Sequence, residues 1–341
     1  MLELHDPRGA FETLEEYLAV ELRDGLVADV YLGYGLSEPL RRESRPAPPE
    51  PCRLPLLAAR VRPAYESNSL LQAPFSVAEW RSSWTPDDYV RAIAEVREAI
   101  RRGDVYQVNL VQHLSAGFDG DADGLAAALA PLRPLHPRPL RGEDWSIVSA
   151  SPEVFLSRRG RTLSARPIKG TRPLGEDVDD AKDAAEHVMI VDLERNDLSR
   201  VCVPGSIEWP ELRVQHELAG VTHLVSTVEG DLRQGVGLAE ILRATFPGGS
   251  ITGAPKTAAI DQIARLEPVG RGASMGALGT VLPNGDFELA LTIRTFAVAG
   301  EHVHLWVGGG VVWDSEPEAE VEESWVKARP LLAAAGGLVA A

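Results

Sequence analysis

One lysine in this sequence has clear potential for nucleophilic chemistry. It is Lys169, in the segment Arg166–Pro173, which reads Arg-Pro-Ile-Lys-Gly-Thr-Arg-Pro. Proline restricts the backbone before the lysine, and glycine frees it afterwards, so the chain can aim the side chain. A lysine that loses hydration in a pocket has a lowered pKa, and its neutral amine is a nucleophile. In an exposed turn the same residue is only a solvated charge.

Two pairs of acids have a spacing that suits metal binding. Asp183 precedes Glu186 by three residues, and Glu320 precedes Glu323 by three. On a helix, each pair shares one face. Two such faces that meet supply oxygen ligands for Mg²⁺, which takes few carboxylates and keeps water or substrate oxygens. Because acid clusters also occur on solvated helix faces, the spacing alone leaves both interpretations open.

Two glycine-rich segments are candidates for contact with a ligand. Pro247–Lys256 leads into an expected helix, where backbone amides can bind an anion. It is not a nucleotide-binding P-loop, because Ala254 and Pro255 interrupt the required Gly-Lys-Ser/Thr. A carboxylate ligand and a plain tight loop both remain open. Gly308–Gly310 indicates either close approach of a ligand to a strand or a sharp bend.

The elements that must position these residues can be read from caps and periodicity. Thr85-Pro86-Asp87 predicts a helix start, and Gly103 predicts its end. An exposed loop is expected over Ser37–Arg53. The other expected helices are 121–129, 179–193, 237–246, 255–266 and 317–334, and the expected strands are 27–32, 105–114, 146–151, a hairpin over 153–168, 274–282, 287–298 and 302–312.

Strands paired through hairpins, with helices between groups of them, favour the α+β class with a large antiparallel sheet. Asn284-Gly285 between two apolar strands is a strong hairpin signal. We expect residues 85–335 to form the catalytic domain as one globular unit, with residues 1–84 as a short N-terminal part packed on it.

Composition narrows the function classes. The chain has 341 residues, of which 44% are hydrophobic and 25% charged, as in ordinary globular proteins. A formal net charge of −16 argues against nucleic acid as a partner. Long apolar runs and a signal peptide are not expected, and Cys52 and Cys202 have no disulfide or metal spacing. These features predict a cytoplasmic protein without membrane contact.

These segments, taken together, resemble the chorismate-utilising enzymes, which include anthranilate, aminodeoxychorismate, isochorismate and salicylate synthases. The matching segments keep the family's order between Thr85 and Pro330. They are Gly103–Leu110, Ser149–Phe155, Pro167–Thr171, Glu186–Asp197, His223–Ser226, Gly249–Lys256, Ile293-Arg294 and the stretch from Gly308 to Lys327. The resemblance implies a large antiparallel β sandwich flanked by helices, like that of anthranilate synthase.

The resemblance also implies a magnesium site and a substrate site. Glu186 and Glu323 would ligate Mg²⁺, with Asp183 and Glu320 acting beside them. The metal would hold the ring carboxylate of chorismate. The residues implied to contact chorismate are Gln107, Thr171, Ser250, Thr252, Gly253, Arg294, Gly309, Gly310 and Lys327.

Three residues would carry the chemistry by the same resemblance. Glu153 resembles the general acid beside the leaving C4 hydroxyl, and His223 resembles the histidine near the enolpyruvyl group. Lys169 occupies the position where aminodeoxychorismate synthases have a lysine and anthranilate synthases have an alanine. In that enzyme the lysine is thought to attack C2 of the ring. Isochorismate and salicylate synthases carry a lysine base where this sequence has Gln107.

The implied activity is that of aminodeoxychorismate synthase component I, a magnesium-dependent transferase. It would convert chorismate and ammonia to 4-amino-4-deoxychorismate, on the route to 4-aminobenzoate and folate. We expect ammonia to come from a separate glutamine amidotransferase, because this sequence shows no amidotransferase segment. Three alternatives stay open: anthranilate synthase component I, isochorismate synthase, which Gln107 disfavours, and a non-catalytic chorismate-binding subunit.

Overall fold

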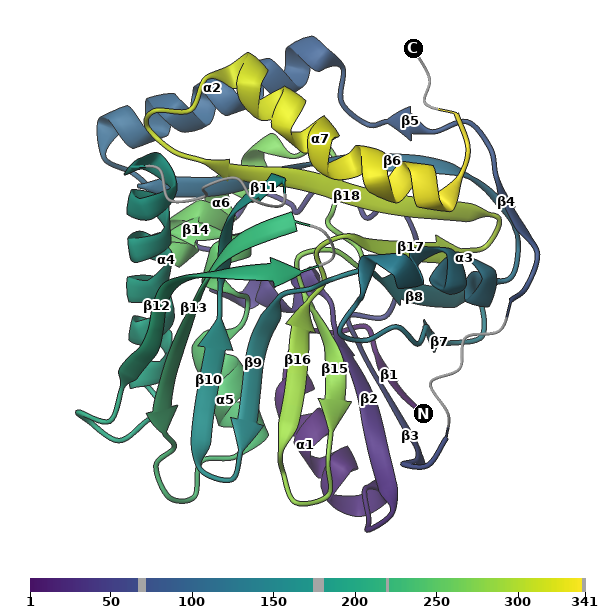
Figure 1. Cartoon of the computed structure of the whole chain (residues 1–341), viewed down its shortest axis with the longest axis vertical. Helices are drawn as coiled ribbons and strands as arrows, with labels where there is room; N and C mark the ends of the chain where they lie inside the picture. The colour runs from purple at the N-terminus through teal and green to yellow at the C-terminus, as the bar shows by residue number, and fades with distance from the viewer. Residues whose placement is uncertain (67–71, 174–180, 219–220, 339–341) are drawn as a thin grey trace.

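Two antiparallel sheets with helices on their outer sides make up the protein, as a computed structural model shows (Figure 1). The structure describes residues 1–66, 72–173, 181–218 and 221–338. Side chains at 170–173, 181–185, 217–218 and 221–223 lie outside the described part. The antiparallel pairing and the mixture of helices and strands confirm the α+β class.

The first sheet joins the two ends of the sequence. Its strand order is β1-β3-β2-β15-β16-β9-β10-β13-β11, and β12 pairs with β13. The N-terminal strands β1 to β3 therefore join the sheet beside β15, with β2 paired to β15 although the two strands are far apart in the sequence. The bounds are β1 Leu2–Leu4, β2 Leu26–Leu32, β3 Leu57–Pro63, β9 Val154–Arg159, β10 Thr162–Arg166, β11 Ile168–Pro173, β12 Glu208–Leu218, β13 Val221–Asp231, β15 Ala277–Val281 and β16 Phe287–Leu291.

The second sheet is built on one long strand. Its order is β14-β6-β18-β17-β8-β7, with β4 and β5 also paired to β6. The bounds are β4 Phe75–Val77, β5 Arg81–Ser82, β6 Gln107–Gly120, β7 Leu140–Arg141, β8 Trp145–Ser149, β14 Gly253–Ala254, β17 Thr295–Ala299 and β18 His302–Val311. In this sheet β18 places Gly308–Gly310 opposite Asn109–Val111 of β6.

Helices cover the outer faces of the sheets. In Figure 1, α2 and α7 lie over β6 and β18, and α4 runs beside β11 and β13. The helices are α1 Ala10–Glu21, α2 Pro86–Arg102, α3 Ala122–Leu129, α4 Ala181–Ser199, α5 Leu238–Thr245, α6 Lys256–Leu266 and α7 Pro317–Ala335, with 3-10 turns η1 Tyr34–Leu40, η2 Ala130–Leu132 and η3 Gly249–Ile251. None of the described helices is both long and apolar enough to cross a bilayer.

The cap signals around α2 are confirmed. Thr85 Oγ1 accepts a hydrogen bond from the Asp88 amide, and Gly103 ends the helix with φ of 81°. Tyr89, Ile93 and Val96 are buried on the apolar face of this helix. The expected helix over 179–193 is longer than predicted, since α4 continues to Ser199 and buries Leu198.

The chain path departs from the sequence expectations in three places: one loop starts later than expected, one expected strand is wrong, and one hairpin was not expected. The expected loop over 37–53 begins inside η1, where Ser37 is buried together with Leu36. The expected single strand over 287–298 is two strands in different sheets. The chain leaves β16 in the first sheet, turns at Arg294 with φ of 50°, and enters β17 in the second. The β12–β13 hairpin was not predicted, because Pro210 and several charged residues obscure strand periodicity.

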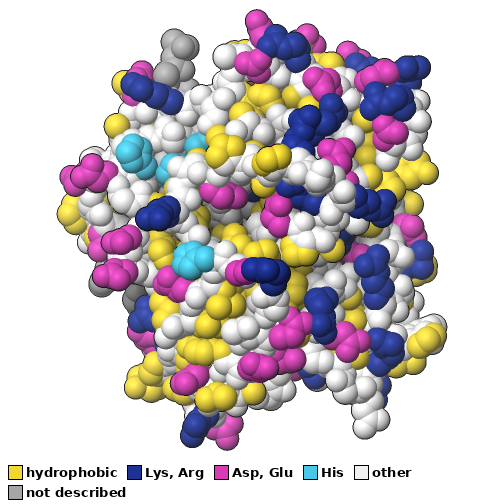
Figure 2. Space-filling model, turned by 180° about the vertical axis from the view of Figure 1, so that it is seen from behind, with side chains coloured by type: hydrophobic (Ala, Val, Ile, Leu, Met, Phe, Trp, Pro, Cys, Tyr) yellow, Lys and Arg dark blue, Asp and Glu magenta, His cyan; other side chains and the backbone are white. Residues whose placement is uncertain are grey.

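Charge is mixed on the surface. Figure 2 shows acidic and basic side chains intermixed over the rear face, with apolar side chains between them. Many of the arginines are paired with nearby acids, as in Arg101 with Glu98 at 2.6 Å on α2. Such exposed pairs contribute little to stability.

One ion pair differs from these because both partners are buried. Arg271 Nη2 lies 2.7 Å from Glu267 Oε1, and the side chains are 1% and 2% exposed. Arg271 also donates to the carbonyls of Ile251 at 2.9 Å and Asn109 at 2.7 Å. Glu267 Oε1 accepts from the Val111 amide at 3.1 Å. The pair therefore fastens the glycine-rich loop to β6.

Breaking this pair should cost much more than breaking a surface pair. In Arg271→Met, Glu267 remains buried without its counter-charge and two carbonyls lose a donor, so we expect the free energy of unfolding to fall by about 3–5 kcal/mol. The matched control Arg101→Ala removes an exposed ion pair and should leave the free energy of unfolding almost unchanged. Urea unfolding followed by circular dichroism measures both, and equal losses in the two variants would contradict this role for Arg271.

Candidate functional site

The Glu153 carboxyl is the centre of the first group of site residues. Glu153 precedes β9 and is 6% exposed. Its Oε1 accepts hydrogen bonds from Ser250 Oγ at 3.1 Å and from the Ile168 amide at 3.4 Å. Burial raises the pKa of Glu153, and the nearby charge of Lys169 is the largest influence that opposes this rise. A buried carboxyl with a raised pKa is suited to proton donation.

Lys169 lies on β11, at an irregularity in the sheet. It pairs with Leu224 of β13, and the register shifts between Lys169 and Thr171. The shift falls at Gly170, where the sequence placed a flexible residue beside the lysine. The Lys169 side chain is half-buried and lies near enough to Glu153 to lower the pKa of that carboxyl.

His187 of α4 is a neighbour of Lys169 that the sequence reasoning missed. It is fully buried, and neither ring nitrogen has a hydrogen-bond partner among the described residues. Burial, together with a smaller effect of the positive charge of Lys169, lowers the pKa of His187 to about 4. The imidazole is therefore neutral at neutral pH. The available signal was its place beside Glu186 in a matched segment.

The glycine-rich loop is folded against β6. Gly253 has φ of 134° and pairs with Val108, and a Cβ atom there would lie 2.1 Å from the Gln107 carbonyl. Thr252 Oγ1 donates to the Gly248 carbonyl at 2.8 Å, so this hydroxyl shapes the loop itself. Ser250 is the loop residue whose hydroxyl reaches another site residue, Glu153.

Gln107 begins β6 next to this loop. Its side chain is fully buried, yet neither its amide oxygen nor its amide nitrogen has a partner among the described residues. A Cβ atom at Gly310 would lie 2.1 Å from Gln107 Nε2, so only glycine leaves room for this side chain. Buried amides are normally hydrogen-bonded, and an unpaired one indicates a place where a ligand or water binds.

The third group lies where α7 crosses β18. Lys327 Nζ is 2.7 Å from Glu323 Oε1 and donates to the Gly308 carbonyl at 3.1 Å. A Cβ atom at Gly309 would meet Lys327 Nζ at 3.2 Å and the carboxylates of Glu323 and Glu320 at 3.6 and 3.7 Å. The glycine run of β18 thus gives access to two carboxylates and an ammonium group.

The expected magnesium ligands are only partly assembled among the described side chains. Glu320 and Glu323 lie together on α7, and Glu186 lies on α4, while the side chain of Asp183 is outside the described part. Within that part, no three His, Cys, Asp or Glu side chains converge closely enough to hold a metal. The oxygen donors on α7 suit a hard cation, and Gly309 leaves space beside them.

Arg294 lies in the turn between β16 of the first sheet and β17 of the second. Its carbonyl accepts from the Ala150 amide at 2.9 Å, which ties the turn to the end of β8. Burial lowers the pKa of Arg294, and the Glu153 carboxyl opposes this effect. Thr171 and His223 face each other in the β11–β13 pairing, but their side chains lie outside the described part.

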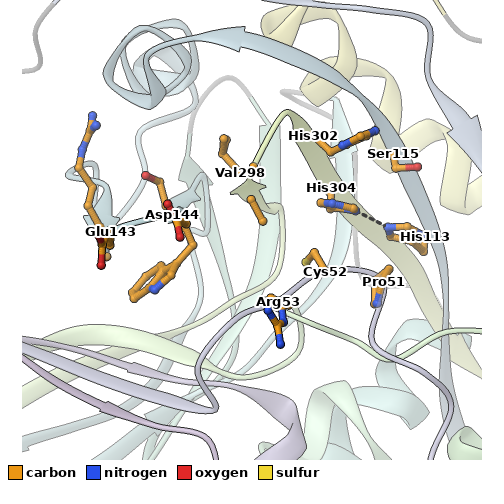
Figure 3. A pocket seen from close by; sticks show the side chains of 16 residues that line it. Pro51, Cys52, Arg53, His113, Ser115, Glu143, Asp144, Val298, His302 and His304 are labelled. Atoms are coloured by element: carbon orange, nitrogen blue, oxygen red, sulfur yellow. Dashed lines mark hydrogen bonds between the residues drawn. The ribbon is translucent and has the colours of Figure 1, made fainter.

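A large cleft lies elsewhere in the described part of the protein. This cleft, of about 940 Å³, is lined by Cys52, Arg53, Trp145 and three histidines. In Figure 3, His113 and His304 are hydrogen-bonded to each other and His302 lies beside them. Residues of the expected site do not line it. A much smaller void is lined by Glu153, Ser250 and Glu194, a buried acid that the sequence reasoning also missed.

Comparison with known proteins identifies the family. A family model described as chorismate binding enzyme matches residues 42–333. Aminodeoxychorismate synthase component 1 of Escherichia coli strain K12 is 39% identical over 270 residues, which are 75% of this chain and 59% of that protein. Anthranilate synthase component 1 of Thermus thermophilus is 40% identical over 273 residues, 75% of this chain and 58% of that protein. The chain thus matches about three fifths of the length of these relatives.

Solved structures show the same fold. Anthranilate synthase component I from Streptococcus pneumoniae superposes with a TM-score of 0.80 at 25% identity, covering 94% of this chain and 85% of that one. The family model spans both glycine-rich segments, both acid pairs and Lys169. This chain belongs to the family of chorismate binding enzymes.

Proposed function

We propose that this protein is aminodeoxychorismate synthase component I, which converts chorismate and ammonia to 4-amino-4-deoxychorismate. The observation that carries the proposal is the position of Lys169, half-buried beside the Glu153 carboxyl and the neutral His187. Similarity alone does not separate the candidates, because the aminodeoxychorismate and anthranilate synthases are equally close, at 39% and 40% identity. Our choice between them rests on Lys169, which resembles the lysine of aminodeoxychorismate synthases.

The proposed reaction uses Lys169 as nucleophile and Glu153 as acid. The Lys169 amine, after it has lost a proton to water, attacks C2 of chorismate, the ring double bonds shift, and the C4–O bond breaks. Glu153 donates its proton to the departing hydroxyl, which leaves as water. Ammonia then adds at C4, the double bonds shift back, and the C2–N bond to the lysine breaks. The enolpyruvyl group is retained.

The surrounding residues support this assignment. Ser250 and the Ile168 amide hold one oxygen of Glu153, which fixes the direction of the acid. Burial keeps Glu153 protonated to a higher pH than an exposed glutamate, because desolvation disfavours its charged form. Gln107 cannot act as the base that activates water, which disfavours the isochorismate synthase reaction.

Charged groups would receive the two carboxylates of chorismate. Arg294 and Lys327 are the proposed partners, with backbone donors from the loop around Ser250. Glu186 and Glu323, supported by Asp183 and Glu320, would hold Mg²⁺. The metal would supply a positive charge for the ring carboxylate, which a protein of net charge −16 needs in order to bind a dianion. Ammonia would come from a glutamine amidotransferase subunit.

The first prediction concerns Lys169. Lys169→Ala should lower aminodeoxychorismate formation by at least about a thousandfold, because the nucleophile is gone. Purified protein is incubated with chorismate, Mg²⁺ and ammonium, and an aminodeoxychorismate lyase then converts the product to 4-aminobenzoate for chromatography. Lys169→Arg keeps the charge without a usable amine and should be equally inactive. Direct release of anthranilate by the wild type, or full activity of Lys169→Ala, would contradict the proposal.

The second prediction concerns the acids on α7. Glu323→Ala should raise the Mg²⁺ concentration needed for half-maximal activity by about tenfold or more, since a direct ligand is removed. Glu322 is the matched control on the same helix, exposed and paired with Arg329. Glu322→Ala should leave the Mg²⁺ titration unchanged. A normal titration in Glu323→Ala would remove this residue from the metal site.

The third prediction uses the unpaired amide of Gln107. Gln107→Leu should keep or increase the free energy of unfolding, by up to about 1–2 kcal/mol, because it removes buried polar atoms that have no partner. It should also raise the KM for chorismate. The control Gln112→Leu, on the same strand, loses a 2.7 Å hydrogen bond to Ser324 and should be destabilised by about 1 kcal/mol. A destabilised Gln107→Leu with normal KM would mean that Gln107 is only structural.

A further inference from the structure

Glu194 is a buried acid that the proposed mechanism does not use. It lies on α4, two turns beyond Glu186, and is 4% exposed. Its Oε1 accepts a hydrogen bond from the Gly249 amide at 3.3 Å, and its Oε2 has no partner among the described residues. Glu194 lines the same small void as Glu153 and Ser250. Glu194 therefore contacts the glycine-rich loop next to Ser250, the residue that donates a hydrogen bond to Glu153.

The charges around Glu194 favour its neutral form. Asp197, one turn further along α4, is paired with Lys256, whose Nζ lies 2.5 Å from Asp197 Oδ2 and 2.7 Å from the Thr245 carbonyl. The positive charge of Lys256 is therefore already engaged. Burial is the main cause that raises the pKa of Glu194 to about 8. The negative charges of Asp197 and Glu153 contribute to this rise, and the positive charge of Lys256 opposes it.

Helix α4 packs so closely against the glycine-rich loop that the position of Glu194 affects the position of the loop backbone. A Cβ atom at Gly249 would lie 2.4 Å from Leu193 Cδ2 and 3.3 Å from Glu194 Oε1. The next residue, Ser250, donates to Glu153. A continuous series of contacts therefore leads from Glu194 through Gly249 and Ser250 to the Glu153 carboxyl.

We propose that Glu194 is a positioning residue that acts as an uncharged carboxyl. It holds the Gly249–Ser250 backbone so that Ser250 orients Glu153, and it keeps a second negative charge away from the bound anion. The inference rests on the proposed function to the extent that the ligand of the loop is chorismate.

The expected pH dependence follows from the sign of the charge. Below its pKa, Glu194 is neutral and the loop accepts the dianion. As the pH rises through that pKa, Glu194 ionises beside Glu153 and the loop, and like charge weakens chorismate binding. The KM for chorismate in the wild type should therefore rise by several fold between pH 7 and pH 9.

Glu194→Gln tests this directly, because glutamine has the shape of the protonated acid and cannot ionise. Its KM at pH 7 should be within about twofold of the wild type, and its rise towards pH 9 should be lost. Glu194→Leu has no polar group for the Gly249 amide, so its KM should be raised at every pH. Asp192→Asn is the control on the exposed side of the same helix, where Asp192 pairs with Arg195, and it should keep the wild-type profile.

Two measurements separate an effect on chorismate binding from an effect on the reaction. The KM is obtained from chorismate consumption, and the dissociation constant from quenching of protein fluorescence, over the same pH range. A wild-type rise of KM in Glu194→Gln, or a normal KM in Glu194→Leu, would overturn the role of Glu194. Product identity is determined separately, so release of anthranilate would overturn the proposed function while leaving the effect of Glu194 on chorismate binding intact.

Discussion

The buried pair of Arg271 and Glu267 is the interaction on which the site depends most. A single guanidinium neutralises Glu267 and also satisfies the carbonyls of Ile251 in the glycine-rich loop and Asn109 in β6. Desolvating two charges is expensive, and good geometry with further hydrogen bonds is what offsets that cost. The loop and the strand are therefore fixed relative to each other. Ser250, which orients Glu153, and Gln107, at the start of β6, consequently keep their separation before any ligand binds.

A second property of the site is that burial favours the neutral form of two of its acids. A protein with 50 acids and 34 basic residues would repel a dianion if the acids near the site were ionised. Burial raises the pKa of both Glu153 and Glu194, which favours their neutral forms. The neutral His187 leaves Lys169 as the nearby cation on that side. Arg294 could then attract an anionic ligand without opposition from the neighbouring Glu153 carboxyl, whereas Lys327 is already paired with Glu323.

Caps and turn residues in the sequence predicted the ends of helices and hairpins well. They did not predict the contacts between segments that are distant in the sequence. The Thr85 cap and Gly103 defined α2 because both act within one helical turn. The turn at Arg294 was missed, since an apolar run on both sides reads as one strand, and only the meeting of two sheets shows where it breaks. His187 and Glu194 were missed for a related reason. Their burial depends on β11 and the glycine-rich loop, which are distant from α4 in the sequence. Lys169 and the acid pairs were found because their types and spacing are themselves chemical signals.

Gln107 and Lys169 together are the reason why we propose amination at C4. A base at position 107 would activate water next to the ring, and this water would compete with the proposed first nucleophile, Lys169. The side chain of Gln107 occupies this position instead, next to Gly310, and its amide does not ionise. The backbone of Gln107 packs against Gly253 of the glycine-rich loop. On the other side, the irregularity between Lys169 and Thr171 places an amine near the buried Glu153 carboxyl. In the proposed reaction, nucleophile and acid would therefore approach the substrate from the first sheet, while the second sheet would supply no competing base at position 107.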